Sequence, residues 1–104
     1  MYIISVDLGS SNFKAVVLKV TENTKEGNIE FIGKVRESNM DFALFICKVL
    51  KIYCISKSDI EVIVVTGTGS SYLDDKVIID NYKVDIVKVD EFDAIGYGGL
   101  ILSH

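Results

Sequence analysis

The N-terminal stretch reads Tyr2-Ile3-Ile4-Ser5-Val6-Asp7-Leu8-Gly9-Ser10-Ser11-Asn12-Phe13-Lys14. A short apolar run ends here at an acidic residue and a turn of small residues. A β-rich pattern then resumes and continues to residue 20. The two runs predict a hairpin of two strands, over residues 2–7 and 13–20, joined by a polar turn.

The turn of this predicted hairpin has the residue types of a site for phosphate and metal. Gly9, Ser10 and Ser11 offer backbone N–H groups and hydroxyls that can receive phosphate oxygens. Lys14 adds a positive charge on the returning strand, and Asp7 would hold Mg²⁺ directly or through water. An ordinary hairpin turn with a solvated lysine fits the same residues, because Asp-x-Gly turns are common.

The middle of the chain predicts a strand, a helix and another strand. Residues 29–35 have a strand pattern, and Ser38 and Asp41 have the spacing of a capping box that opens a helix over about residues 39–54. Residues 60–65 form a nearly continuous apolar run, as expected of a buried parallel strand.

The last third of the chain predicts three further elements. The segment over residues 72–82 is short and its pattern is ambiguous, and we interpret it as one helix. Residues 84–89 are predicted as a fifth strand and residues 90–102 as a last helix. The order β-β-β-α-β-α-β-α predicts an α/β fold, with a mixed five-stranded sheet and flanking helices. We expect residues 1–104 to form a single domain.

A second motif, Thr66-Gly67-Thr68-Gly69-Ser70-Ser71-Tyr72-Leu73-Asp74, follows the predicted fourth strand. Gly67 and Gly69 at the carboxyl end of a buried strand would allow a ligand to approach the backbone closely. Asp74 could then act as a carboxylate base near a substrate hydroxyl. The alternative is structural, since Ser71 and Asp74 also have capping-box spacing and Asp74 would then only cap a helix.

A third motif lies in the predicted last helix and reads Asp90-Glu91-Phe92-Asp93-Ala94-Ile95-Gly96-Tyr97-Gly98-Gly99-Leu100. Each glycine inside a helix costs about 1 kcal/mol relative to alanine, so such a helix usually needs close packing against another backbone. Its glycine face is therefore a candidate contact with another lobe or subunit. A frayed C-terminal tail is the alternative.

Composition narrows the class of protein. The chain has 104 residues, a formal net charge of −4 and no basic cluster, which argues against a surface for nucleic acid or anionic membrane. No secretion signal is apparent, so we expect a cytoplasmic protein. Cys47 and Cys54 are expected as a pair of buried thiols on a helix, not as a disulfide. With His104 as the only histidine, a Ser-His-Asp site is excluded.

Taken together and in this order, the three motifs resemble the actin-like ATPase superfamily, whose lobes have a ribonuclease H-like fold. The resemblance is strongest to the eukaryotic-type (type II-like) pantothenate kinases. That family has an Asp-x-Gly-Gly-Ser/Thr-x-x-Lys loop, similar to Asp7, Gly9, Ser10, Ser11 and Lys14 here. Its Thr-Gly-Gly-Gly-Ala-Tyr-Lys-Phe-Glu and Asp-Glu-Leu-Asp-Cys segments are similar to residues 66–74 and 90–94.

The resemblance implies the N-terminal lobe of an ATP-dependent pantothenate kinase, which catalyses the first step of coenzyme A biosynthesis with ATP and Mg²⁺. Asp74 stands where that family has its catalytic glutamate, although its side chain is one methylene shorter, and Thr68 replaces a glycine of the family motif. The implied partner is a C-terminal kinase lobe, in the same protein or a separate chain, and self-association is a further expectation.

Two other interpretations stay open. The chain could be a non-catalytic module that pairs with a full-length kinase and regulates it. It could also be a lobe of another actin-like protein, such as a sugar or acyl kinase or a dehydratase-activating ATPase. The last kind usually holds an iron–sulfur cluster with cysteines, for which Cys47 and Cys54 on one buried helix are poor candidates.

Overall fold

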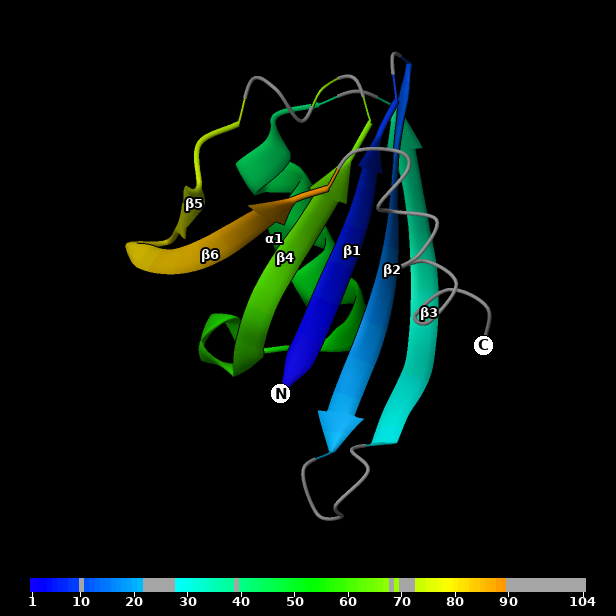
Figure 1. The fold of residues 1–104 in the computed structure, drawn as a ribbon, viewed down its shortest axis with the longest axis vertical. Helices are drawn as coiled ribbons and strands as arrows, with labels where there is room; N and C mark the ends of the chain where they lie inside the picture. Colours follow the sequence, from blue (N-terminus) through cyan, green and yellow to red (C-terminus); the bar gives the residue numbers. More distant parts are fainter. Residues whose placement is uncertain (10, 22–27, 39, 68, 70–72, 90–104) are drawn as a thin grey trace.

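The computed structural model describes residues 1–9, 11–21, 28–38, 40–67, 69 and 73–89. Within these residues, six strands form one mixed sheet and a helix covers one of its faces (Figure 1). The strands are β1 (Tyr2–Leu8), β2 (Asn12–Thr21), β3 (Asn28–Ser38), β4 (Ile60–Thr66), β5 (Lys76–Ile79) and β6 (Tyr82–Lys88). The helix is α1 (Phe42–Tyr53), and a short 3-10 helix, η1 (Lys57–Asp59), precedes β4.

The order of strands in the sheet is β3-β2-β1-β4-β6-β5. β1, β2 and β3 form an antiparallel meander, whereas β4 runs parallel to β1, and β6 runs parallel to β4. β5 returns antiparallel on β6. As a result β1, β4 and β6 all end at the same edge of the sheet, where open α/β sheets bind their ligands.

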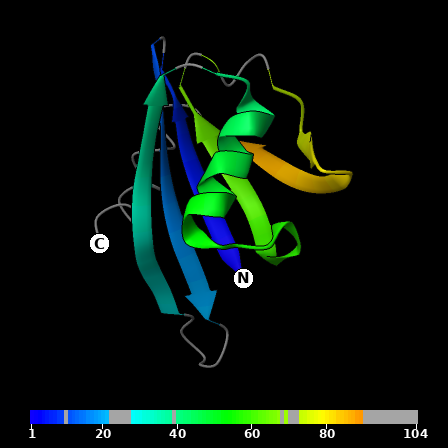
Figure 2. The ribbon, with the colours of Figure 1, turned by 180° about the vertical axis from the view of Figure 1, so that it is seen from behind.

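α1 packs across one face of the sheet, as the view from behind shows (Figure 2). Its apolar residues recur at the spacing of one helix face, which is why this segment folds as an amphipathic helix. The residues of that face are all buried: Phe42, Phe45, Ile46, Val49 and Leu50. Phe45 meets Phe13 of β2 edge to face, with ring centroids 5.5 Å apart, so α1 is anchored on the hairpin as well as on β4.

α1 begins later than the capping pattern predicts. Asp41 is the N-cap, and its carboxylate accepts a hydrogen bond from the Leu44 N–H at 3.2 Å. Ser38 is the last residue of β3, so the prediction of a helix from residue 39 with Ser38 as its cap is wrong. The Asp41 carboxylate thus caps one of the free N–H groups of the first turn, a role that the pattern had given to Ser38.

The other end of α1 is closed by Cys54 in a left-handed conformation, with φ 54°. Both cysteines are free thiols, as predicted, but only Cys47 is partly buried and Cys54 is exposed. The preceding residue, Tyr53, packs against Gly33 of β3, where a β-carbon would lie 2.0 Å from the Tyr53 hydroxyl oxygen. That hydroxyl donates to the Lys34 carbonyl oxygen at 3.1 Å, which ties the last turn of α1 to β3.

The predicted helix over residues 72–82 is wrong in its described part, which instead contributes β5 and the turn into β6. Ile79 pairs with Tyr82, and the two residues between them, Asp80 and Asn81, both have positive φ (48° and 68°). Positive φ at both central residues is typical of a type I′ hairpin turn. The turn lets β5 fold back and pair antiparallel with β6. The sheet therefore has six strands among the described residues, not the predicted five.

The predicted last helix over residues 90–102, with its glycine face, lies outside the described residues. In the part of the chain that the structure describes, no helix has the length and apolar character needed to cross a membrane.

Candidate functional site

The turns that follow β1 and β4 lie side by side at one edge of the sheet. We call them the β1 turn, between Leu8 and Asn12, and the β4 turn, which begins at Gly67. Asp7 pairs with Thr66 in parallel register, so the two turns leave adjacent strands at the same level. The two turns therefore converge at one edge of the sheet.

Glycine makes this close approach of the two turns feasible. Gly67 has a φ of +96°, and a β-carbon there would lie 2.6 Å from the Leu8 carbonyl oxygen and 2.9 Å from Asp7 Oδ1. A β-carbon at Gly69 would lie 3.0 Å from the Leu8 β-carbon. The β4 turn thus rests directly on the end of β1. The expected role of Gly67 and Gly69, to let a ligand approach the backbone closely, stays a prediction.

The β1 turn is closed by a hydrogen bond from the Gly9 N–H to the Asn12 carbonyl oxygen, 3.0 Å long. Ser11 is exposed, and its hydroxyl oxygen accepts a hydrogen bond from the Asn12 side chain at 3.2 Å. Ser10, the other predicted phosphate donor, lies outside the described residues. Asp7 and Lys14 are directly opposite each other across β1 and β2, so both side chains stand on one face of the sheet.

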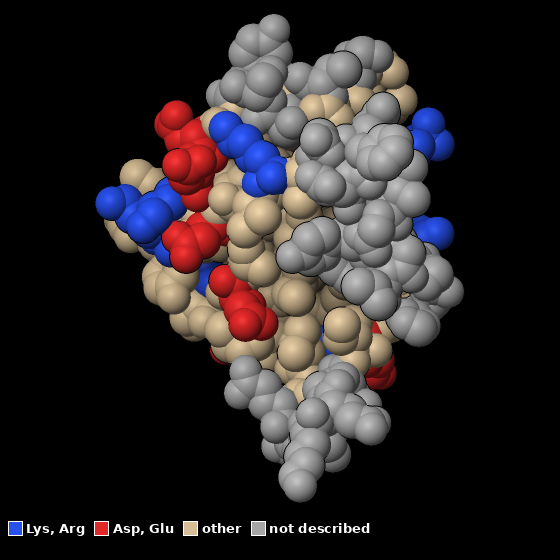
Figure 3. Space-filling model, in the orientation of Figure 1, with Lys and Arg blue, Asp and Glu red and all other residues tan. Residues whose placement is uncertain are grey.

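That face, opposite α1, contains a cavity of about 410 Å³. Figure 3 views this face, on which basic groups emerge at the right margin, on the side of β3. The described residues that line the cavity are Ser5, Asp7, Lys14, Ala15, Val16, Lys34, Val35, Arg36 and Thr66. The predicted metal residue and the predicted phosphate lysine therefore share one cavity.

Lys34 and Arg36 of β3 also line this cavity, although the sequence analysis did not predict them as site residues. Lys14 is opposite Arg36, and Val16 is opposite Lys34, so the strand register brings both cations beside Lys14. The signal available in the sequence was their spacing of two along a strand, which puts both side chains on one face. This spacing alone does not place the two side chains beside Lys14, because that depends on the register between β2 and β3.

The Thr66 hydroxyl oxygen is buried, and it has no hydrogen-bond partner in the described part of the chain. An unpartnered buried hydroxyl costs about 1–3 kcal/mol in proteins. It stands next to Asp7 in the parallel register, on the cavity side of β4. A phosphate oxygen or a metal-bound water at this position would satisfy it.

The charged groups of the cavity also fit a nucleotide with its metal. Among the described residues, the ion pairs join Lys48 to Glu37 and Lys76 to Asp85, and neither involves the cavity. In the part of the chain that the structure describes, no group of three or more His, Cys, Asp or Glu side chains gathers to hold a metal by itself. Mg²⁺ suits such a site, because it commonly takes one or two carboxylates together with waters and substrate phosphates.

Asp74 is exposed, in the segment between β4 and β5. Residues 73–75 are not helical, so the alternative in which Asp74 only caps a helix is wrong. The Lys88 side chain donates to the Leu73 carbonyl oxygen, and the Ile86 N–H donates to the Asp75 carbonyl oxygen at 2.7 Å. These bonds hold the segment against β6, and Lys88 pairs with Val65 close to the end of β4.

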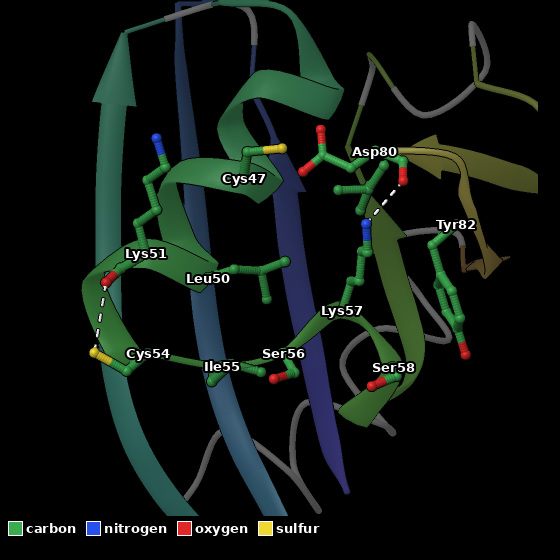
Figure 4. A pocket seen from close by; sticks show the side chains of 11 residues that line it. Cys47, Leu50, Lys51, Cys54, Ile55, Ser56, Lys57, Ser58, Asp80 and Tyr82 are labelled. Atoms are coloured by element: carbon green, nitrogen blue, oxygen red, sulfur yellow. Dashed lines mark hydrogen bonds between the residues drawn. The ribbon is translucent and has the colours of Figure 1, made fainter.

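A second hollow, of about 690 Å³, lies near the opposite edge of the sheet, between the end of α1, η1 and the β5–β6 turn (Figure 4). The Lys57 side chain spans it and donates to the Asp80 carbonyl oxygen at 2.8 Å. Cys47 and Cys54 are among its lining residues. Although larger, this hollow contains none of the predicted site residues, so the cavity beside Asp7 is the candidate site.

No protein-family model matches the chain, and no curated protein matches it. Several solved structures, in contrast, are similar to the chain. The activator of 2-hydroxyisocaproyl-CoA dehydratase from Clostridium difficile, with bound ADPNP, is 22% identical over 94% of this chain, with a TM-score of 0.65. Component A of the (R)-2-hydroxyglutaryl-CoA dehydratase from Acidaminococcus fermentans is 23% identical over 96%, with a TM-score of 0.63.

A ROK family protein from Streptococcus pneumoniae, in complex with sucrose, is 17% identical over the whole chain, with a TM-score of 0.52. The present chain spans only about a third of the length of these three proteins (32%, 35% and 39%). The likenesses establish the fold: the chain has the mixed α/β fold that these structures share, as predicted. None of the three is a pantothenate kinase.

Proposed function

We propose that this chain is one lobe of an ATP-dependent phosphotransferase or ATPase, and that its β1 and β4 turns form one wall of the nucleotide cleft. The observation that carries the proposal is the contact between Gly67 and Asp7 beside the unpartnered Thr66 hydroxyl. A strand-end carboxylate, a close glycine turn and a free hydroxyl are the groups that a phosphate and its metal would use.

Each predicted site residue has a role in this proposal. The β1 turn receives phosphate oxygens at Ser10 and Ser11, Gly9 closes the turn through its N–H bond to the Asn12 carbonyl oxygen, and Lys14 neutralises the phosphate charge. Asp7 and Thr66 hold Mg²⁺ through its waters, and the ion supplies further charge neutralisation. Phosphoryl transfer depends mainly on positioning and on such neutralisation, so few protein groups are needed. Asp74 would accept the proton of an acceptor hydroxyl.

A second lobe would complete the cleft, either in the remainder of a longer protein or in a separate chain. The proposal for this partner rests on the length comparison, because this chain spans only about a third of the structures it matches. The lobe alone leaves the adenine unburied, so we expect it to bind Mg·ATP weakly.

The test is a titration of the ¹⁵N-labelled chain with Mg·ATP, followed by NMR. We expect the amide signals of Gly9, Ser11 and Gly67 to shift, and the Asp7→Asn variant to lose the shifts. Asp59→Asn, in η1 before β4, is the matched control and should keep them. Shifts confined to the hollow between α1 and the β5–β6 turn would count against the proposal.

For the phosphate acceptor we propose pantothenate, which would make the chain a lobe of a pantothenate kinase. This finer proposal is supported by the resemblance of residues 66–74 and 90–94 to the family motifs, and by nothing in the compared structures. It is tested by combining the chain with the C-terminal lobe of a pantothenate kinase and measuring ATP-dependent phosphorylation. Asp74→Glu should raise the rate, and Asp74→Asn should abolish it.

The second candidate is an ATPase lobe of the dehydratase-activator kind, which the TM-scores of 0.65 and 0.63 to two such activators favour. This candidate predicts ATP hydrolysis that needs no acceptor hydroxyl, whereas a kinase lobe in a complete cleft transfers phosphate only when the acceptor is present. Comparing phosphate release with and without pantothenate in the combined protein separates the two.

A further inference from the structure

We infer that Lys34 and Arg36 of β3 form a second oxyanion subsite, next to the phosphate site, for another carboxylate or phosphate group. The inference rests on the proposed function and extends it, because it gives the cavity a ligand class. The cavity would take two anionic groups, one at Asp7 with its metal and one on β3.

The strand register brings the four charged groups together. Asp7 is opposite Lys14 on β2, and Lys14 is opposite Arg36 on β3, so the three side chains form one row across three neighbouring strands. Lys34 is two residues from Arg36 on the same face. All four line one cavity. With strands about 4.8 Å apart, Asp7 and Arg36 are separated by about 10 Å at the backbone.

The charges of this row are unbalanced. Lys14 and Arg36 are like charges directly opposite each other, an arrangement that destabilises a pair of strands. Four other lysines have acceptors among the described residues: Lys48 pairs with Glu37, Lys76 with Asp85, and Lys57 and Lys88 donate to carbonyl oxygens. Among the described residues, neither Lys34 nor Arg36 has an acidic partner. A bound oxyanion would supply the missing negative charge, and a guanidinium can bind it with two hydrogen bonds.

Apolar and small groups lie beside the row of Asp7, Lys14 and Arg36. Ser5 and Val16 are opposite each other on β1 and β2, one step along the strands from Asp7 and Lys14, and both line the cavity. This lining suits a ligand whose two anionic groups are joined by a short apolar segment, or two ligands that meet there. The second anionic group could belong to the nucleotide or to an acid-bearing acceptor.

The experiment follows the Nε–H signals of arginine and the backbone amides by NMR, in the full chain. One arm adds Mg·ATP alone, and a second adds 4-hydroxybutyrate, which carries a carboxylate and a hydroxyl, in the presence of Mg·ATP. A shift of the Arg36 side-chain signal in the first arm assigns the subsite to the nucleotide phosphates. A shift only in the second arm assigns it to the acceptor, and either result supports the inference.

Arg36→Gln and Lys34→Gln should each weaken, by about tenfold, the affinity for the ligand that shifts the Arg36 signal, Mg·ATP or 4-hydroxybutyrate. This is the effect expected for the loss of one charge-assisted hydrogen bond. Lys83→Gln, an exposed position on β6, is the matched control and should leave it unchanged. Both test residues are exposed, so the ligand-free spectra should stay dispersed.

Shifts at Gly9 and Gly67 without any response at Lys34 or Arg36 would overturn the inference and leave the proposed function standing. The two β3 cations would then act only as edge-strand charges that discourage pairing with other chains. If neither group of signals responds, the proposed function fails together with the subsite.

Discussion

Gly67 lies so close to Asp7 that a β-carbon at Gly67 would stand 2.9 Å from the Asp7 Oδ1 atom. The two residues come from adjacent parallel strands, and their contact holds the carboxylate at the end of β1 against the backbone of the β4 turn. No side chain separates the two turns at this point. A ligand at the edge of the sheet can therefore contact both turns at once.

Gly67→Ala should destabilise the protein, because alanine is strained at a φ of +96° and its β-carbon would meet the Leu8 carbonyl oxygen at 2.6 Å. We expect a loss of about 1–3 kcal/mol in the free energy of unfolding, measured by denaturant titration. Gly69→Ala is the control, since its β-carbon would be nearest to the Leu8 β-carbon, at 3.0 Å, and would stand 3.5 Å from the Leu8 carbonyl oxygen. Equal losses in the two variants would contradict the strain argument.

Thr66→Val should separate stability from ligand binding. Valine has nearly the shape of threonine but removes the buried hydroxyl that lacks a partner, so the ligand-free protein should gain about 1 kcal/mol in stability. The same variant should bind Mg·ATP more weakly, because the proposed ligand uses that hydroxyl. Thr66→Ser, which keeps the oxygen, should retain the binding. A Thr66→Val protein that is less stable than wild type would show that the hydroxyl is already satisfied.

Asp41→Ala should cost about 1 kcal/mol in the free energy of unfolding, the usual effect of removing an N-cap. Ser38→Ala, three residues earlier and in β3, should change stability by no more than about 0.5 kcal/mol. Thermal unfolding followed by circular dichroism measures both. A larger effect at Ser38 than at Asp41 would restore the predicted capping box.

Gly33→Ala should displace the Tyr53 ring, since the added carbon would lie 2.0 Å from its hydroxyl oxygen. We expect a loss of about 1–3 kcal/mol from overpacking. Tyr53→Phe should cost only about 1 kcal/mol, because it keeps the ring and removes the hydrogen bond to the Lys34 carbonyl oxygen.

In a Tyr53→Ala background the Gly33→Ala change should become nearly neutral, because the ring it displaces is gone. Additive losses in the double variant would instead place the cost in the β3 backbone.

The sequence predicted five of the six described strands, β1, β2, β3, β4 and β6, as well as α1, because each has a strand or helix pattern or a continuous apolar run. β5 was missed because its hairpin turn is Asp80-Asn81, without the glycine or proline that usually marks such turns. The sequence signal for this turn was the pair Asp80 and Asn81, two residue types that tolerate positive φ, between Ile79 and Tyr82.

The candidate site was only partly predictable. Asp7, Gly9 and Lys14 stand in one short segment, so local spacing was enough to find them. Arg36 is 22 residues after Lys14 in the sequence, and its place in the cavity depends on strand pairing that no local pattern reveals. The Thr66 hydroxyl was equally hidden, since its burial results from packing.

β3 forms one outer margin of the sheet along its eleven residues, and its two halves differ in character. Lys34 and Arg36 lie in the half nearer the β1 turn, whereas the side chains of Ile29 and Phe31 in the other half are each 42% exposed. An exposed margin with apolar side chains is a template onto which another extended polypeptide can add. At high concentration we therefore expect aggregation to nucleate at Ile29 and Phe31, and a lysine at position 31 to improve solubility.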